Sequence, residues 1–204
     1  MKILKELYYN KYSKKSFSIS SVDLIIERIF SNFNHGIYLD IGCNHPIKYN
    51  NTYLLFKKGW NGINIDVDSE SIKQFNLMRK KDHNVNALVT SKDNEEKDLY
   101  FYHKRSAINT ISKDLAEKRD NKPKKIKKLK GKSINTIIED SPFQNKKINL
   151  LSIDIENYEF EALKEFNFDK YNVDVIVSEV TDVDSSKLEL YNNSLEKITS
   201  SKIY

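Results

Sequence analysis

The stretch from residue 38 to residue 68 constrains the fold more than any other part of the chain. An apolar segment, residues 37–41, runs into a turn that holds Gly42 and Asn44, and a second apolar segment, residues 62–66, follows a short helical pattern. A strand, a turn that lets a ligand approach the backbone and an acidic residue ending the next strand form half of a doubly wound nucleotide-binding sheet. The stretch therefore predicts an α/β fold with a mostly parallel central sheet and helices on both faces.

Helix and strand patterns alternate along the rest of the chain. The predicted helices cover residues 22–33, 50–59, 68–78 and 185–204, and the predicted strands cover residues 85–90, 99–103, 148–155 and 173–180. The run over residues 148–155 is nearly continuous in apolar character, as expected for a central parallel strand that is buried on both faces. The strand over residues 99–103 is expected at a sheet edge or in an insertion.

Length and charge predict a single domain with one unusual basic stretch. A chain of 204 residues is long enough for one α/β domain with a sizeable core, so we expect one domain over residues 1–204 with an N-terminal helical segment over residues 1–35. The net charge is +5, and the basic excess is concentrated in residues 118–132. Because like charges repel, this stretch is predicted to be a mobile loop. The charge is not spread over a face, so nucleic acid is not a predicted partner.

The cysteine content and hydropathy bear on the cellular compartment. Cys43 is the single cysteine, which excludes an intrachain disulfide. The sequence does not begin like a signal peptide, and no apolar run approaches the roughly 18 residues that span a bilayer. We therefore expect a cytoplasmic protein without a membrane span.

Five carboxylates fall at or just after the predicted carboxyl ends of strands. They are Asp40, Asp66, Asp154, Glu156 and Glu179. Ligands of open parallel sheets bind beyond these strand ends. Any one of the five could be a helix cap or a solvated charge, but their convergence on one edge of the sheet predicts a ligand site.

The turn after the first strand indicates which ligand. A dinucleotide site uses three glycines so that the pyrophosphate can lie against a helix N-terminus, whereas this turn has only Gly42, with Pro46 near the third place. S-adenosylmethionine has no phosphate, so one glycine and polar side chains such as Asn44 suffice. Asp66 follows Gly42 by 24 residues and is placed to accept hydrogen bonds from both ribose hydroxyls. We predict S-adenosylmethionine as the cofactor.

Several of these segments together resemble the FkbM-type S-adenosylmethionine-dependent methyltransferases. The similar segments are Asp40-Ile-Gly-Cys-Asn44, Asn51-Thr52 with Leu54, Gly59 to Asp66, Ala87 to Ser91, Leu151 to Glu159 and Val175 to Glu179. The resemblance covers most of residues 36–180, and it implies a Rossmann-like class I methyltransferase fold. It also implies O-methylation, in bacteria often of sugars in surface polysaccharide (capsule or O-antigen) pathways.

Two residues and the end of the chain depart from the family pattern. Asn157 follows the Asp-x-Glu sequence where glycine is usual, and Pro46 stands in the first loop where glycine is frequent. Both departures bear on the acceptor pocket. A sheet of this type normally has two more strands at its end, so the sequence predicts a version of the fold that lacks the last strands.

The strand ends and the resemblance together give the candidate site residues. The candidate cofactor contacts are Asp40, Gly42, Cys43, Asn44, Thr52, Asp66, Val67, Val89 and Asp154. The candidate catalytic residues are Asp154 as the leading general base, Glu156 beside it and His103. The substrate expected from these assignments is a hydroxyl of a sugar or a nucleotide-sugar.

Other interpretations of the same residues remain open. A divalent cation held by Asp154, Glu156 and Glu179 is an alternative that we do not favour, because oxygen clusters also occur without metals. Asp66-Val67-Asp68 is the pattern that holds Mn²⁺ in some glycosyltransferases, and a non-catalytic Rossmann-like binding module is a third hypothesis. The basic stretch over residues 118–132 is either a lid that recognises phosphate or, more simply, a solvated segment.

Overall fold

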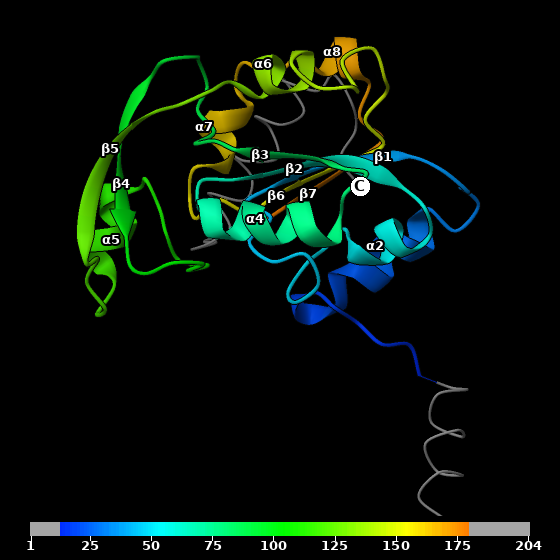
Figure 1. Ribbon diagram of the computed structural model, residues 1–204, viewed down its shortest axis with the longest axis horizontal. Helices are drawn as coiled ribbons and strands as arrows, with labels where there is room; N and C mark the ends of the chain where they lie inside the picture. Colours follow the sequence, from blue (N-terminus) through cyan, green and yellow to red (C-terminus); the bar gives the residue numbers. More distant parts are fainter. Residues whose placement is uncertain (1–12, 180–204) are drawn as a thin grey trace, which may run out of the picture.

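A five-stranded parallel sheet forms the centre of the molecule in the computed structural model, which describes residues 13–179 (Figure 1). Its strands are β1 (Ile37–Ile41), β2 (Asn61–Asp66), β3 (His83–Asn86), β6 (Leu150–Ile153) and β7 (Val175–Ser178), in the spatial order β3-β2-β1-β6-β7. β1 pairs with β2 on one side and with β6 on the other. The order reverses at β1, and in such sheets a ligand crevice opens at the switch point beyond the carboxyl ends of the strands.

Helices cover both faces of the sheet, as predicted. On one face lie η1 (Ile19–Ser21), α2 (Val22–Ile29), α3 (Tyr53–Lys57) and α4 (Ser69–Met78), and on the other lie α6 (Ile134–Glu139), α7 (Glu159–Leu163) and α8 (Phe168–Tyr171) (Figure 1). β6 is buried along its whole length and β1 over its last four residues, because side chains on both of their faces meet a helical layer. The architecture is a Rossmann-like α/β fold.

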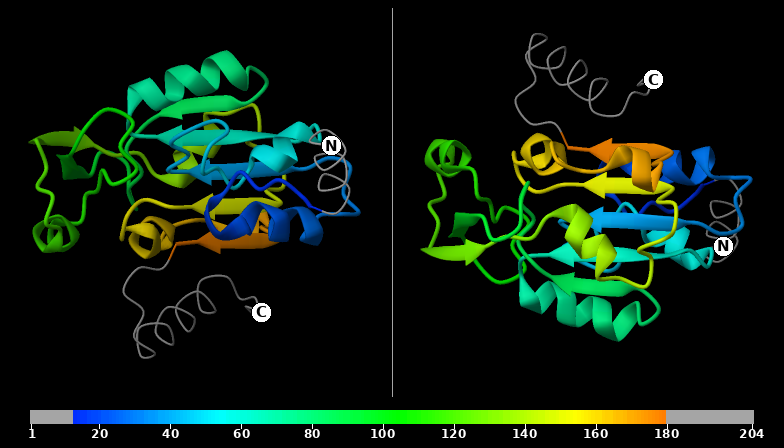
Figure 2. Two further views of the ribbon diagram at one scale, coloured as in Figure 1. Left: turned by 90° about the horizontal axis from the view of Figure 1, so that it is seen from below. Right: turned by 90° about the horizontal axis from the view of Figure 1, so that it is seen from above.

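An insertion between β3 and α6 stands apart from the main sheet. It contains β4 (Glu96–Phe101), α5 (Lys113–Lys118) and β5 (Lys125–Lys130), and β4 pairs with β5 as an antiparallel ribbon. Two views of the molecule show this ribbon beyond the carboxyl ends of the central strands (Figure 2). The predicted strand over residues 99–103 thus belongs to an insertion and not to an edge of the central sheet.

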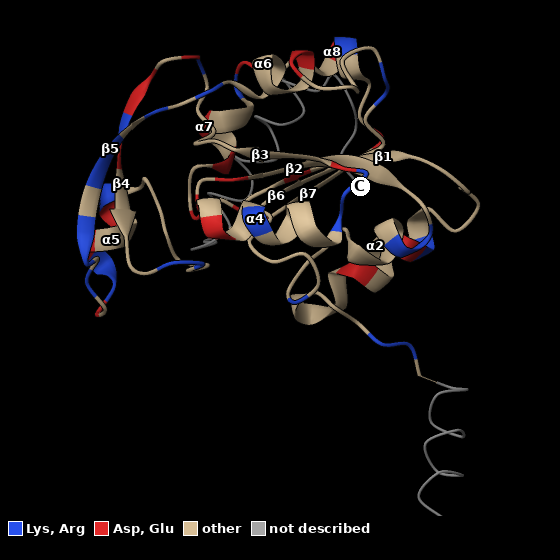
Figure 3. Cartoon of the chain, in the orientation of Figure 1, with Lys and Arg blue, Asp and Glu red and all other residues tan. Residues whose placement is uncertain are grey.

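The prediction of a loop over residues 118–132 was wrong, because β5 lies within this stretch. Asp98 lies opposite Lys128 in the ribbon, and Glu96 lies opposite Lys130. The ammonium group of Lys127 lies over the ring of Phe101, 4.1 Å from its centroid. These acidic and aromatic partners on β4 offset the repulsion among the lysines, and Figure 3 shows the resulting basic outer strand.

Other sequence expectations changed in detail. The strand predicted over residues 85–90 is shorter, and Val89 makes only an isolated bridge with Lys132. Met78, the last residue of the helix predicted over residues 68–78, is 49% exposed because α4 ends there. The predicted helix over residues 185–204, and with it the question of further strands, lies outside the described residues. Within residues 13–179, no helix combines the length and the apolar character that a membrane crossing requires.

Candidate active site

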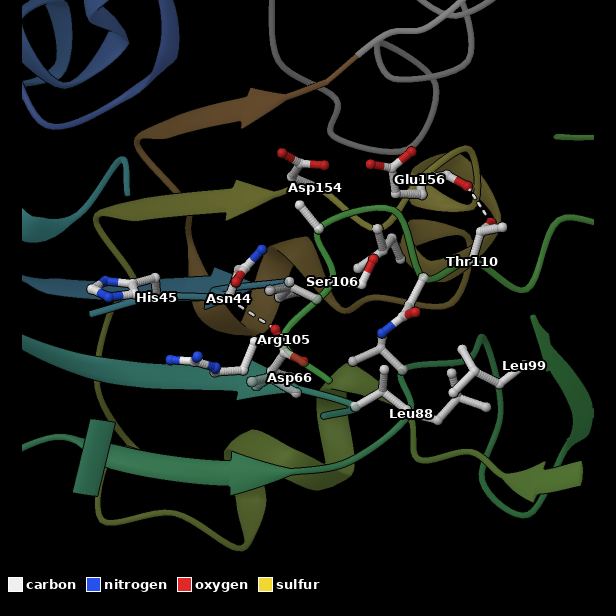
Figure 4. Close-up of a pocket in the computed structure, with 18 of the residues that line it drawn as sticks. Asn44, His45, Asp66, Leu88, Leu99, Arg105, Ser106, Thr110, Asp154 and Glu156 are labelled. Carbon is white, nitrogen blue, oxygen red and sulfur yellow. Dashed lines mark hydrogen bonds between the residues drawn. The ribbon is translucent and has the colours of Figure 1, made fainter. Parts of the chain in front are cut away.

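A cavity of about 600 Å³ opens at the carboxyl edge of β1, β2 and β6. The ends of these strands, the loop after β1 and the loop between β4 and α5, residues 103–111, line it (Figure 4). Of the predicted site residues, the cavity brings together Gly42, Asn44, Asp66, Val67, Val89, His103, Asp154 and Glu156, and it adds Glu179. Asp40, Cys43 and Thr52 are not among the lining residues.

Gly42 lets the first loop pass close to the end of β6. Its φ is +78°, and a Cβ at this position would lie 1.8 Å from the carbonyl oxygen of Asp154. The Gly42 N–H donates to the carbonyl oxygen of Ile65 at 2.9 Å, which joins the loop to β2 as well. Only glycine satisfies both the positive φ and the close approach, so this residue brings β1, β2 and β6 together at the cavity floor.

Asp66 organises the neighbouring turn with its two carboxylate oxygens. Oδ2 accepts the backbone N–H of Asn44 at 2.9 Å, and Oδ1 accepts that of Asp68 at 2.7 Å. Burial raises the pKa of Asp66 to about 6, although these two hydrogen bonds act in the opposite direction. Each carboxylate oxygen can accept a second hydrogen bond, so Asp66 retains acceptor capacity toward the cavity.

Asp40 belongs to a buried polar network beneath the loop instead of lining the cavity. Its Oδ2 accepts hydrogen bonds from Thr52 Oγ1 at 2.7 Å and from Asn50 Nδ2 at 3.0 Å. Thr52 is itself fully buried, and Cys43 packs in a small apolar cluster. Asp40, Cys43 and Thr52 therefore support the loop from below, a role that the strand-end argument did not distinguish from ligand contact.

Arg79, at the carboxyl end of α4, is the centre of this network, and the sequence analysis missed it. It is fully buried, and its guanidinium donates to the Pro46 carbonyl oxygen, to Asn50 Oδ1 at 2.7 Å and to Thr52 Oγ1 at 2.8 Å. Its positive charge opposes the rise in the pKa of Asp40 that burial causes. Arg79 thus ties the loop that follows β1 to the body of the domain.

The opposite side of the cavity is acidic. Asp154, Glu156 and Glu179 each offer one carboxylate oxygen, and these oxygens all lie within 4.8 Å of one another. Asp154 is open to solvent at the cavity mouth, but the protein atoms packed around its carboxyl group and the nearby Glu179 carboxylate raise its pKa to about 8. A carboxyl group with such a pKa can exchange a proton near neutral pH.

Glu156 is held by the insertion. Its carboxylate forms an ion pair with Arg119, which also donates to the Ile108 carbonyl oxygen at 2.6 Å. Thr110 Oγ1 donates to the backbone carbonyl oxygen of Glu156 at 2.7 Å (Figure 4). Burial raises the pKa of Glu156, whereas Arg119 lowers it. Because its carboxylate is already paired, Glu156 is a less available base than Asp154.

The backbone after Asp154 adopts an uncommon conformation. Glu156 and Asn157 have φ values of 60° and 73°. Asparagine tolerates this left-handed region better than most residues with a side chain. The asparagine that replaces the family's usual glycine is therefore compatible with the turn.

The remaining predicted residues line other parts of the cavity. Val67 and Val89 lie with Leu88 and Leu99 among its apolar lining residues. His103 is exposed at the rim, and its Nδ1 lies 3.0 Å from the carbonyl oxygen of Lys104.

The fold and the cavity at the strand ends are consistent with the class of Rossmann-like methyltransferases. The methyltransferase FkbM domain matches residues 40–198, which is more than half of the chain. The chain therefore belongs to the FkbM methyltransferase family, as the resemblance of its motifs indicated. Searches of curated proteins and of solved structures gave no match.

Proposed function

We propose that this protein is an S-adenosylmethionine-dependent O-methyltransferase whose acceptor is a hydroxyl of a sugar or nucleotide-sugar. The observation that carries the proposal is the glycine-opened turn at Gly42, which lies between Asp66 on β2 and Asp154 after β6 in one cavity. The family resemblance suggests bacterial surface polysaccharide synthesis as the setting, and the single cysteine favours the cytoplasm as the location.

The lining residues fit the cofactor in chemistry. Asp66 has acceptor capacity for the two ribose hydroxyls, and the apolar side chains of Val67, Leu88 and Val89 suit an adenine ring. Gly42 lets the loop after β1 lie directly against the Asp154 carbonyl group, so this loop and the end of β6 line the cavity side by side. S-adenosylmethionine, when bound, supplies an electrophilic methyl group.

Asp154 is the proposed general base. When the bound donor supplies its methyl group to the acceptor hydroxyl, the Asp154 carboxylate would accept the proton of that hydroxyl. Orientation of the two reactants supplies a large part of the rate in such transfers. The loop that Arg79 fixes and the turn that Arg119 fixes would hold the two reactants in this orientation. Glu179 raises the proton affinity of Asp154.

The cation alternative remains less favoured. A divalent ion at the acidic side of the cavity would have to compete with Arg119 for the Glu156 carboxylate. Its remaining ligands would be Asp154 and Glu179. We therefore propose a mechanism without a metal.

The glycosyltransferase alternative loses support at Asp68. Its carboxylate caps α4 by accepting the N–H of Glu70 at 2.9 Å, and its second oxygen accepts the N–H of Arg105. Asp68 is also buried and, unlike Asp66, does not line the cavity, so it is a poor Mn²⁺ ligand at this site. No residue of β5 lines the cavity, so we also do not propose that its lysines form a phosphate-binding lid.

Isothermal titration with S-adenosylhomocysteine, the demethylated cofactor, tests the proposal. Wild-type protein should bind it, Asp66→Asn should bind it at least about tenfold more weakly, and Asp169→Asn, an exposed carboxylate on α8, should match wild type. Absence of binding to wild type would contradict the proposal. Binding without methyl transfer to a panel of sugars and nucleotide-sugars would favour the non-catalytic module instead.

A further inference from the structure

One end of the cavity is cationic, in contrast to the acidic side at Asp154. Lys48, Arg105 and His45 lie near one another among the lining residues, and Lys104 precedes Arg105 in the same lining loop. The side chains of Arg105 and His45 point in the same direction, away from Asp154 (Figure 4). Among the ion pairs within residues 13–179, none involves Lys48, Lys104 or Arg105.

Hydrogen bonds to the backbone hold this end in place. The Arg105 N–H donates to the Asp68 carboxylate, and Arg105 has a φ of 53°. Nδ1 of His45 accepts the N–H groups of Ile47 at 3.1 Å and of Lys48 at 3.0 Å. Because Nδ1 is an acceptor, the proton of the neutral imidazole resides on Nε2, which is then a hydrogen-bond donor.

Positive charges lie close to His45. The pKa of His45 is lowered first by burial and then by the positive charges of Arg105, Lys48 and Arg79. Three carboxylates lie near these groups: Asp66 and Asp68 each accept backbone N–H groups, and Glu70 pairs with Lys73 on the outer side of α4. The ammonium group of Lys48 lies over the Tyr49 ring, 4.5 Å from its centroid, which leaves its N–H groups able to donate. Lys104 and Arg105 form no ion pair within residues 13–179, so all three side chains remain available for a ligand.

We propose that Lys48, Lys104 and Arg105 form an anion-binding subsite that takes a carboxylate or a phosphate of a bound ligand. Two sources supply this chemistry: the amino-acid carboxylate of the methyl donor and a phosphate on the acceptor. The subsite deepens the proposed function and rests on it for the identity of the ligand. It also assigns phosphate recognition to the cavity rather than to the lysines of β5.

The test uses a double variant, Lys48→Met/Arg105→Met, and a matched control, Arg28→Met/Lys80→Met. All four side chains are exposed, and those of the control do not line the cavity. Both variants should therefore keep the melting temperature of wild type. The probes are S-adenosylhomocysteine, 5′-methylthioadenosine, which lacks the amino-acid tail, and inorganic pyrophosphate added to protein saturated with S-adenosylhomocysteine.

Each source of the anion gives its own result in titration calorimetry. If the donor's carboxylate occupies the subsite, the double variant should bind S-adenosylhomocysteine at least about tenfold more weakly than the control does, with the affinity for 5′-methylthioadenosine unchanged. If an acceptor phosphate occupies it, pyrophosphate should bind the saturated wild type and bind the double variant at least about tenfold more weakly. Equal affinities of the double variant and the control for all three probes would overturn the subsite.

Failure of the proposed function is distinguishable from failure of the subsite. Wild type that binds neither S-adenosylhomocysteine nor 5′-methylthioadenosine would contradict the methyltransferase proposal alone. Pyrophosphate added to the cofactor-free protein would then decide the matter, since binding that depends on Lys48 and Arg105 would support the subsite and its absence would overturn it.

Discussion

Substitution of Arg79 by methionine tests whether the buried network supports the cofactor loop. Methionine keeps much of the side-chain length but removes the guanidinium, which donates to the Pro46 carbonyl, Asn50 and Thr52. The substitution also leaves the buried Asp40 carboxylate without the nearby positive charge. Removing one partner of a buried charge pair costs about 3–5 kcal/mol of unfolding free energy. For a chain of this size the melting temperature should fall by about 6–20 °C.

Urea and thermal denaturation measure this loss against the control Arg28→Met. Arg28 is exposed, so its substitution should change the unfolding free energy by less than about 0.5 kcal/mol. The double variant Asp40→Asn/Arg79→Met should lose less than the sum of the two single changes, because a neutral amide does not need the cation. A loss below about 1 kcal/mol for Arg79→Met would refute the role of Arg79.

Three further predictions concern the cavity itself. The folded pKa of Asp66, about 6, lies above its ordinary value of 3.8, so between these values the folded protein retains a proton that the unfolded chain has lost. The free energy of unfolding should therefore decline as the pH rises from about 4 to 6. The affinity for S-adenosylhomocysteine should rise with pH, because binding needs the ionised carboxylate. Calorimetric titrations from pH 5 to 7.5 that show no change in this affinity would contradict the assignment of Asp66. With an acceptor in hand, the methyl-transfer rate should increase with pH and level off above about 8, where Asp154 is ionised. Asp154→Asn should lower kcat by about 10²–10⁴-fold and retain the affinity for the cofactor. An unaltered kcat would show that Asp154 is not the general base. Gly42→Ala should lower the melting temperature and weaken cofactor binding, because the added Cβ would overlap the Asp154 carbonyl group. Gly59 also has a positive φ but has open space around it, so Gly59→Ala should cause smaller losses. Equal losses for the two variants would show that the close approach at Gly42 is unimportant.

The central sheet could be predicted because its strands are recognisable from local sequence patterns. β1 and β6 are short apolar runs with a carboxylate at or just beyond their ends, and helical spacing separates them from their neighbours. β5 could not be predicted in this way, because its lysines are stabilised by Phe101, Asp98 and Glu96 on a strand that lies far away in the sequence. Charge repulsion is a local property, whereas the compensation for it depends on tertiary structure.

Part of the site followed from position along the strands, and part did not. Gly42, Asp66 and Asp154 line the cavity because strand ends converge on one edge of a parallel sheet. Asp40 lies one residue before the end of β1, and alternation along the strand turns its side chain into the buried network instead. Sequence spacing that is uncertain by one residue cannot separate these two outcomes.

Arginine usage is a signal that could have found the missed residues. Of the 34 lysines and arginines, only Arg28, Arg79, Arg105 and Arg119 are arginines. Arg79 and Arg119 each donate to two or more groups from one planar guanidinium, which the single ammonium of lysine does less well. In this lysine-rich chain, two of the four arginines therefore mark positions where a fixed, multidentate cation is needed, whereas Arg28 is exposed.

A crystal structure of the complex with S-adenosylhomocysteine tests the central claim most directly. We predict that both ribose hydroxyls lie within hydrogen-bond distance of the Asp66 carboxylate, with the sulfur atom beside Gly42 and facing Asp154. Adenosine bound away from the ends of β1 and β2, with Asp66 in contact with solvent alone, would contradict the proposed methyltransferase site.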